Sequence, residues 1–325
     1  MTSRCNIEKK VMIVGATPQT GGMGGVTIHV ERFLQYLEKV NFRCEFFNYK
    51  TAPFFDVIGK IKKSLLVHIH VCNPFYMFFL AVACRLCHKK LVMTLHGKYV
   101  EREVRYWWLI KKSVKMATVP IVLNQTSYES CRKINPKTTL IPAFIPPQAE
   151  ELLSDDIINV VSSIHQRGRL AVVTYGYDVI YDVEKREIYG IDFLISFFKD
   201  NQTYDLIVSD PTSNYKKKHT ENYSNIHFVN QPHSLYELMK IADVFIRNTS
   251  KDGDALSVKE ALYLKKTVLC SDVVERPKGV FLFHYSDRMS LKSCLDSNLK
   301  HDVPTPESGE RQIVELYAKL QEGVS

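Results

Sequence analysis

Two carboxylates eight positions apart are the residues of this sequence best suited to chemistry on a polar ligand. Asp252 stands in an Asp-Gly-Asp turn, and Glu260 follows two turns further along an apolar helix pattern. Glycine tolerates unusual backbone angles and acidic residues suit the first turn of a helix, so the turn predicts a helix N-terminus. Such a terminus points N–H groups at an anion, and a carboxylate beyond it can bind a diol such as a ribose. The segment predicts a nucleotide-sugar site, with a capped helix before a buried strand as the alternative.

A glycine-rich segment, Gly21-Gly22-Met23-Gly24-Gly25, lies between the first predicted strand and the first predicted helix. Four glycines let the backbone approach a ligand closely, and the helix N-terminus that follows favours phosphate. The spacing is not G-x-G-x-x-G, so the segment does not indicate a dinucleotide. A flexible connector is the alternative interpretation.

Three histidines follow or occupy predicted strands. His96 comes directly after a strand at 91–95, where polar residues face the ligand-binding edge of an open α/β sheet. It is a candidate for the reacting centre, with a structural role as the alternative. His68 and His70 alternate with apolar residues and so point the same way, but the sequence identifies no third metal ligand. We predict a structural role for both.

These residues must be positioned by the elements around them. Apolar and β-branched runs predict strands at 11–14, 44–49, 66–71, 91–95, 121–124 and 139–144, then at 170–174, 206–209, 226–229, 244–247, 268–270 and 279–284. Helical spacing predicts helices from residue 26 and at 75–87, 104–114, 191–198, 235–241, 255–264, 291–299 and 311–320. Strand–helix alternation of this kind predicts parallel sheets covered on both faces. Prolines at 142, 146 and 147 and the acidic run 150–156 predict the linker between two domains.

The segment 247–272 resembles a signature of retaining glycosyltransferases of the GT-B fold, glycosyltransferase family 4 in particular. The family pattern is Glu, seven residues, Glu, then Ala, and a strand that ends in Ser-Asp. The family has an aromatic residue where this chain has Asp254, which is a departure. The matching residues are Asp252 (for the first Glu), Gly253, Glu260, Ala261, Ser271 and Asp272.

The resemblance implies an α/β protein with two Rossmann-like, doubly wound parallel-sheet domains that face each other across a cleft. Residues 1–150 would form the acceptor-side domain, and residues 165–305 would form the domain that binds the nucleotide sugar. The C-terminal helix, within 306–325, would pack back on the first domain.

The resemblance also implies roles for individual residues. Glu260 would hold the ribose, Asp252 would hold the sugar together with the following backbone, and His96 would lie near the donor sugar. The glycine loop would lie beside the donor diphosphate. The leaving diphosphate would help to deprotonate the acceptor, so no protein nucleophile, metal or cofactor other than the nucleotide-diphosphate sugar is expected. The residues that would contact the nucleotide-diphosphate sugar through the glycine loop and the turn before the helix are Gly24, Gly25, Gly253, Asp254, Ala255 and Leu256.

Two cations common in the family are missing from this chain. Tyr177 and Tyr189 stand where the family commonly carries Arg and Lys for the diphosphate. We predict Arg247 as the replacement, because it ends a strand that leads into the Asp252 turn. Pairing of Arg247 with a carboxylate is the alternative. The other candidate cations are Lys185, Arg186 and Lys251.

The formal net charge of +8 favours an anionic partner. The segment 105–115 combines both tryptophans with four cations and, with Lys60, Lys62 and Lys63, could form a basic face for an anionic membrane. An amphipathic helix with buried tryptophan is the alternative, and no nucleic-acid recognition motif is visible. The polar start of the chain does not resemble a signal peptide, and the eight cysteines have no disulfide pattern. The sequence predicts a cytoplasmic protein, in part peripheral on the inner face of the membrane.

The resemblance predicts a hexosyltransferase that acts on a polysaccharide or lipid-linked glycan in the synthesis of surface polysaccharide, such as lipopolysaccharide. Two alternatives stay open. A nucleotide-sugar epimerase can share the fold and would act without an acceptor. A non-catalytic nucleotide-sugar-binding subunit would explain the missing cations and the Asp at position 252.

Overall fold

The computed structural model describes residues 10–21, 24–97, 99, 105–252, 255–297 and 304–322. The chain forms two compact units, Met1–Ala149 with Glu307–Ser325, and Glu150–Pro306. Each unit contains a six-stranded sheet in which all strand pairs are parallel. The prediction of two parallel α/β sheets is therefore confirmed.

The sheet of the first unit has the strand order β2-β1-β3-β4-β5-β6. Its strands are β1 (Val11–Gly15), β2 (Cys44–Asn48), β3 (Leu66–Ile69), β4 (Lys90–Leu95), β5 (Val119–Val122) and β6 (Thr139–Leu140). Its helices are α1 (Pro18–Gly21), α2 (Gly25–Lys39), α3 (Asp56–Lys63), α4 (Pro74–Leu86), α5 (Trp107–Met116), α6 (Gln125–Arg132) and α13 (Glu310–Glu322).

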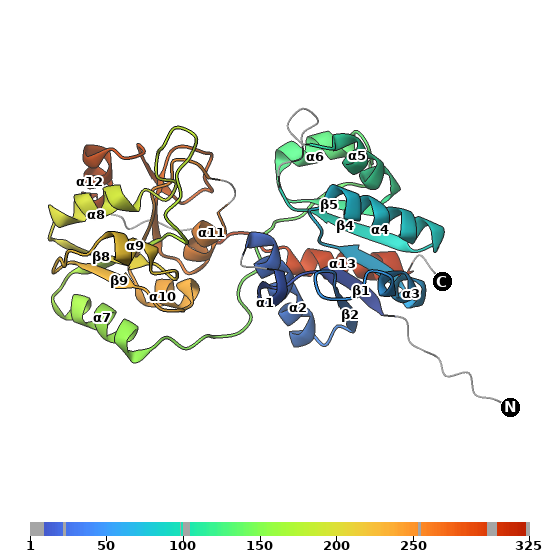
Figure 1. The fold of residues 1–325 in the computed structure, drawn as a ribbon, viewed down its shortest axis with the longest axis horizontal. Helices are drawn as coiled ribbons and strands as arrows, with labels where there is room; N and C mark the ends of the chain where they lie inside the picture. Colours follow the sequence, from blue (N-terminus) through green and yellow to red (C-terminus); the bar gives the residue numbers. More distant parts are fainter. Residues whose placement is uncertain are drawn as a thin grey trace. The chain divides into compact units, whose positions relative to one another are not determined.

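Alternate residues of β1, next to the middle of the first sheet, enter different cores. Met12 and Val14 of β1 pack in the cluster that receives α3, α4, α5 and α6. Val11 and Ile13 pack in the opposite cluster with α2 and α13. Period-2 alternation places successive side chains on opposite faces of a strand, so both faces of this sheet are buried. Helix α13, drawn in red in Figure 1, covers the second face, and Tyr317 on it is fully buried.

The sheet of the second unit has the order β12-β11-β10-β7-β8-β9. Its strands are β7 (Leu170–Tyr175), β8 (Tyr204–Ser209), β9 (Ile226–Val229), β10 (Val244–Arg247), β11 (Thr267–Ser271) and β12 (Phe281–Phe283). Helices α7 (Asp155–Gln166), α10 (Leu235–Ile241) and α11 (Leu256–Tyr263) pack on one face of it. Helices α8 (Ile191–Lys199), α9 (Asn214–Lys218) and α12 (Arg288–Asp296) pack on the other.

The structure corrects the predicted linker. Asp155 and Asp156 are not in a linker but form the first turn of α7, where acidic residues favour a helix N-terminus. Ile157, Val161 and Ile164 of this helix are buried in the second unit, which therefore starts at Glu150 rather than at 165. Helices α3 and α6 were also not predicted. Both have only eight residues, so their apolar periodicity is short.

In the part of the chain that the structure describes, we find no helix with the length and apolar character needed to cross a membrane.

Candidate functional site

Strand order singles out one place in the second unit. From β7 the chain continues to β8 on one side, whereas β10 pairs with β7 on the other side. In open parallel sheets, ligands bind outside the carboxyl ends of the strands at such a reversal of strand order. Arg247 ends β10 and Tyr175 ends β7, so both residues stand at this place.

Arg247 forms a bidentate ion pair with Asp252. Its Nε donates to Oδ2 at 2.7 Å, and its Nη2 donates to Oδ1 at 3.0 Å. The planar guanidinium matches a carboxylate in this geometry, which fixes both groups. The alternative weighed for Arg247, pairing with a carboxylate, is thus what the structure shows.

A second arginine that sequence analysis missed completes this cluster. Arg276 follows β11, and its Nη1 donates to Asp252 Oδ2 at 2.6 Å. Its Nη2 donates to Thr249 Oγ1 at 3.1 Å, and its Nε donates to the Ser271 carbonyl at 3.2 Å. The Thr249 hydroxyl in turn donates to Asp252 Oδ2. We call Asp252, Arg247 and Arg276 the carboxyl-edge cluster.

The charges in the carboxyl-edge cluster do not cancel. Two guanidinium groups and one carboxylate give a formal charge of +1, and all three side chains are largely buried. Burial alone would raise the pKa of Asp252, but hydrogen bonds and charge from Arg247 and Arg276 lower it to about 2. Burial lowers the pKa of Arg247, whereas Asp252 raises it, and the net direction is upward. The cluster therefore stays ionised at neutral pH and its surplus charge suits an anion.

Tyrosines surround the same strand ends. The Arg247 guanidinium lies over the ring of Tyr189, 5.8 Å from its centre, and Tyr175 meets Tyr189 edge to face. Tyr177 is exposed. Tyr189, one of the two tyrosines that stand where the family commonly carries Arg or Lys, thus contacts Arg247, the cation that the sequence predicted as their replacement.

Helix α11 begins directly after the turn. Its N-cap residue, Ala255, offers no side-chain hydrogen bond to the first turn, so the helix N-terminus is not capped by that side chain. Leu256 is the first residue of the helix, and Glu260 is buried within it. Glu260 and Arg247 both act electrostatically on Tyr175, so the predicted ribose carboxylate and the cation share one neighbourhood. Two further predicted contacts, Gly253 and Asp254, lie outside the described residues.

The N-terminus of α8, also at the carboxyl edge, is occupied by the chain itself. Glu187 accepts the backbone N–H groups of Ile191 and Asp192 at 3.1 and 2.9 Å. Burial raises the pKa of this carboxyl. Since this carboxylate already accepts the first two N–H groups of α8, the N-terminus of α11 is the better candidate for an anion.

The other candidate cations are all solvent-exposed. Lys185 and Lys251 are exposed. Arg186 is exposed and pairs with Asp182 and Glu184. None of these three side chains has the burial of Arg247 or Arg276, so the two arginines are the stronger candidates to neutralise a diphosphate.

In the first unit, Gly24 and Gly25 lie at the N-terminus of α2. Thr27 caps this terminus by accepting from the Gly24 N–H at 3.2 Å and donating back to its carbonyl at 3.0 Å. A Cβ atom at either glycine would meet no described heavy atom within 4 Å, which leaves room for a ligand beside the backbone. Gly22 and Met23 lie outside the described residues.

His96 follows β4, and its Nε2 lies 3.0 Å from Nδ1 of His70. Burial lowers the pKa of both rings well below the usual histidine value, so both are neutral at physiological pH. His68 is also buried, and its two ring nitrogens contact Tyr317 and Thr94. His68 therefore has the hydrogen bonds expected of a structural residue.

Comparisons with known proteins concern the fold. No family model and no curated protein matches the sequence. Among solved structures, the chain is similar to HepE from Anabaena in complex with UDP and glucose, with a TM-score of 0.63, 14% identity, and coverage of 97% of this chain and 99% of that one. The corresponding complex of HepE with UDP-glucose gives a TM-score of 0.62.

Two further structures match over most of their length. Sucrose-phosphate synthase from Thermosynechococcus elongatus has a TM-score of 0.60 and 14% identity, with 97% of this chain and 100% of that chain covered. A protein assigned as a UDP-N-acetylglucosamine 2-epimerase from Listeria monocytogenes has a TM-score of 0.61 and 12% identity, with 97% of each chain covered. Identities this low establish the fold alone: this chain has the two-domain α/β fold of GT-B proteins, as its sequence predicts.

Proposed function

We propose that this protein is a retaining glycosyltransferase that moves a hexosyl group from a nucleotide-diphosphate sugar to a polysaccharide or lipid-linked glycan acceptor. The carboxyl-edge cluster carries the proposal, because it holds a surplus positive charge at the reversal of strand order and next to the N-terminus of α11. The similar fold of HepE, solved with UDP-glucose, supports a nucleotide sugar as the ligand.

In this proposal the second unit recognises the donor. Arg247, Arg276 and the N–H groups at the start of α11 bind the diphosphate, while Asp252 holds the two guanidinium groups in register. Glu260 accepts hydrogen bonds from the ribose hydroxyls. The backbone around Ala255 and Leu256 contacts the transferred sugar. A contact of Asp252 with that sugar remains part of the proposal.

Catalysis in this proposal is electrostatic. As the bond between the sugar and the diphosphate breaks, negative charge grows on the diphosphate, and preorganised cations stabilise it. A diphosphate oxygen takes the proton of the acceptor hydroxyl, which attacks from the same face and retains the configuration. Correct positioning of the donor supplies the rest of the rate enhancement. Gly24, Gly25 and His96 of the first unit would contribute contacts to the donor. The transfer step itself uses no cofactor beyond the donor.

An anionic membrane is the proposed location of the acceptor, which places the protein in the cytoplasm and partly on the inner membrane surface, in surface polysaccharide or lipopolysaccharide synthesis. Exposed aromatic residues support this: Phe55 is 81% and Trp108 55% exposed, and the Lys112 ammonium lies over the Trp108 ring. Trp107, in contrast, packs on the core. Trp108 thus agrees with a membrane-binding face, and Trp107 agrees with an amphipathic helix that buries tryptophan. Lipid interfaces favour exposed aromatic residues beside lysines.

Thermal unfolding with a panel of nucleotide sugars tests donor binding, because a ligand that binds only the native state raises the apparent stability. Transfer is then measured with the stabilising donor and short glycan acceptors, and the anomeric configuration of the product is assigned by NMR. Stabilisation by no nucleotide sugar, or an inverted product, would contradict the proposal.

A nucleotide-sugar epimerase is the second candidate, favoured by the similarity of fold to the protein from Listeria monocytogenes. The same NMR experiment without acceptor separates the two functions. Appearance of an epimerised nucleotide sugar would identify an epimerase. Stabilisation by a nucleotide sugar with neither product would identify a non-catalytic binding subunit.

Membrane association is tested by sedimentation with liposomes. Binding should require anionic lipid and should weaken when salt is raised, because the lysine contribution is electrostatic. Replacement of Lys111, Lys112 and Lys115 by Gln should reduce it. Equal binding to neutral and anionic liposomes would remove this part of the proposal.

A further inference from the structure

A cluster of imidazoles lies at the carboxyl edge of the first sheet. His70 follows β3, His96 follows β4, and His29 projects from α2. One ring nitrogen of each lies within 4.8 Å of one nitrogen of each of the others. Strands β1 and β3 are neighbours, and β2 lies on the far side of β1, so this edge also has a reversal of strand order at β1 and β3.

The ring positions fit a single metal ion. The ring centres are 5.3 Å apart for His29 and His70, 5.0 Å for His29 and His96, and 5.3 Å for His70 and His96. Three imidazoles aimed at one tetrahedral ion, at zinc–nitrogen distances of about 2.0–2.1 Å, have their ring centres roughly 5 Å apart. Their nitrogens would be roughly 3.3 Å apart in that geometry, so binding would require the rings to rotate toward one another.

Hydrogen bonding supplies the second observation. His29 Nδ1 lies 2.9 Å from the Ala143 carbonyl, which can only accept, so Nδ1 carries the proton and Nε2 has a lone pair. Among the described residues, His29 Nε2 is buried without a hydrogen-bond partner, and the same holds for His70 Nε2. A buried nitrogen without a partner costs free energy. A histidine whose other ring nitrogen donates to a backbone carbonyl is, in addition, the usual arrangement of a metal ligand.

We propose that the first unit binds one divalent transition-metal ion, with zinc as the best fit, through His29, His70 and His96. Neutral imidazoles bind zinc, copper, nickel and iron, and three imidazoles leave a fourth position for water or a substrate oxygen. The ion would lie in the first unit, and His96, to which the proposed function gives a contact with the donor, would be one of its ligands. This inference does not rest on the proposed transfer function.

His68 provides a matched control. It lies two residues before His70 on the same strand and is equally buried, but both of its nitrogens already have hydrogen-bond partners. Its substitution should therefore disturb packing without removing a ligand.

The test uses the full chain without an affinity tag, after treatment with a chelator. Titration with Co²⁺ alone, followed by visible absorption, should give d–d bands of a four- or five-coordinate ion that saturate near one ion per chain, and Zn²⁺ should displace the ion. His29→Asn and His96→Asn should each weaken zinc affinity at least tenfold, because loss of even a group that only orients a metal ligand costs about 10–100-fold in affinity. His68→Gln, checked for folding by circular dichroism, should retain it.

Absence of saturable Co²⁺ bands in the parent protein would overturn the proposal. Equal affinity in His96→Asn and the parent would do the same, because the ion would then be held elsewhere, for example by thiolates. Because the titration needs no sugar, failure of glycosyl transfer would not affect this result, and failure of metal binding would not affect the transfer assay.

Discussion

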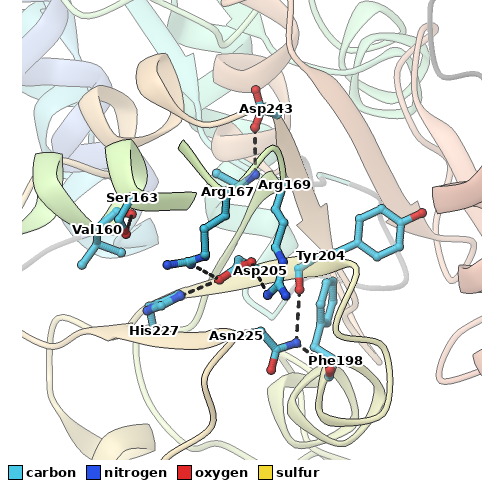
Figure 2. Close-up of polar contacts among 11 residues, drawn as sticks. Val160, Ser163, Arg167, Arg169, Phe198, Tyr204, Asp205, Asn225, His227 and Asp243 are labelled. Carbon is cyan, nitrogen blue, oxygen red and sulfur yellow. Dashed lines mark hydrogen bonds and ion pairs between the residues drawn. The ribbon is translucent and has the colours of Figure 1, made fainter. Parts of the chain in front are cut away.

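Two buried aspartates of the second unit are each held by two arginines, at opposite ends of the same sheet. Figure 2 shows Arg167, Arg169 and His227 converging on Asp205 near the amino ends of β7, β8 and β9. At the carboxyl edge, Arg247 and Arg276 converge on Asp252. The pairs are similar in chemistry, so a difference in role must come from position and solvation.

The arginines differ in their access to water. The side chains of Arg167 and Arg169 are 41% and 31% exposed, whereas those of Arg247 and Arg276 are 12% and 3% exposed. A half-exposed guanidinium keeps much of its hydration, so the amino-edge arrangement needs no ligand. Among these three side chains, two largely buried guanidinium groups share one carboxylate, and an anion would stabilise their formal charge of +1. A charged cluster therefore indicates a binding site when it is desolvated, unbalanced and located at the ligand edge of the sheet.

The largest expected effect is on turnover, and it distinguishes the carboxyl edge of the second sheet from its amino edge. Arg276→Met and Arg247→Met should each lower the turnover of the proposed transfer by about 10²–10³-fold, the range seen when one preorganised donor to a developing charge is removed. Arg169→Met, the matched change at the amino edge, should leave turnover within about twofold. Steady-state kinetics on variants with native circular dichroism measure this. An equal loss in Arg169→Met would show that activity follows stability and that the comparison fails.

Ligand affinity should also differ across the sheet. Glu260→Gln should weaken binding of the nucleotide diphosphate by roughly 1–3 kcal/mol, the loss of a charge-assisted hydrogen bond to the ribose. Glu237→Gln on α10, another buried helical carboxylate, pairs with Lys240 and serves as the control. Isothermal titration calorimetry measures both. Parent affinity in Glu260→Gln would remove the ribose contact from the proposal.

Acid should weaken the carboxyl-edge cluster within a defined pH range. The folded pKa of Asp252, about 2, lies below its ordinary value of 3.8, so its ionised form stabilises the fold above pH 4. That contribution, on the order of 2 kcal/mol, is lost as the pH falls from about 4 to about 2. The difference in unfolding free energy between the parent and Asp252→Asn should shrink by this amount over that range. Urea unfolding at several pH values measures it, and a pH-independent difference would contradict the ion pairing.

The smallest effect is expected at the amino edge. Arg167→Gln should lower the unfolding free energy by only about 0.2–1 kcal/mol, because this arginine is half exposed and Asp205 keeps Arg169 and His227. Nucleotide affinity should not change. Urea unfolding and calorimetry on one preparation check both statements. A large loss of nucleotide affinity would show that the amino edge also serves the ligand.

The elements that position the carboxyl-edge cluster were largely predictable. The predicted bounds 226–229, 235–241 and 244–247 agree with β9, α10 and β10, because buried strands are short apolar runs and helices repeat apolar residues every three or four positions. Strand β6 is shorter than predicted, since only Thr139 and Leu140 pair with β5 and a proline follows at 142. Local patterns thus locate elements better than they locate element ends.

The sequence by itself determined the alternation of strands and helices and the positions of Asp252 and Glu260 on either side of one helix start, because these features depend on residues close together in the chain. Only the tertiary structure brought Arg276 to Asp252, which is 24 residues away, and His29 to His70 and His96. A long-range contact between loops leaves no periodic signal, since its two sides are joined by the packing of the sheet rather than by their spacing. The sequence therefore located the edge at which chemistry can occur, and the packing of each sheet decided which side chains meet there.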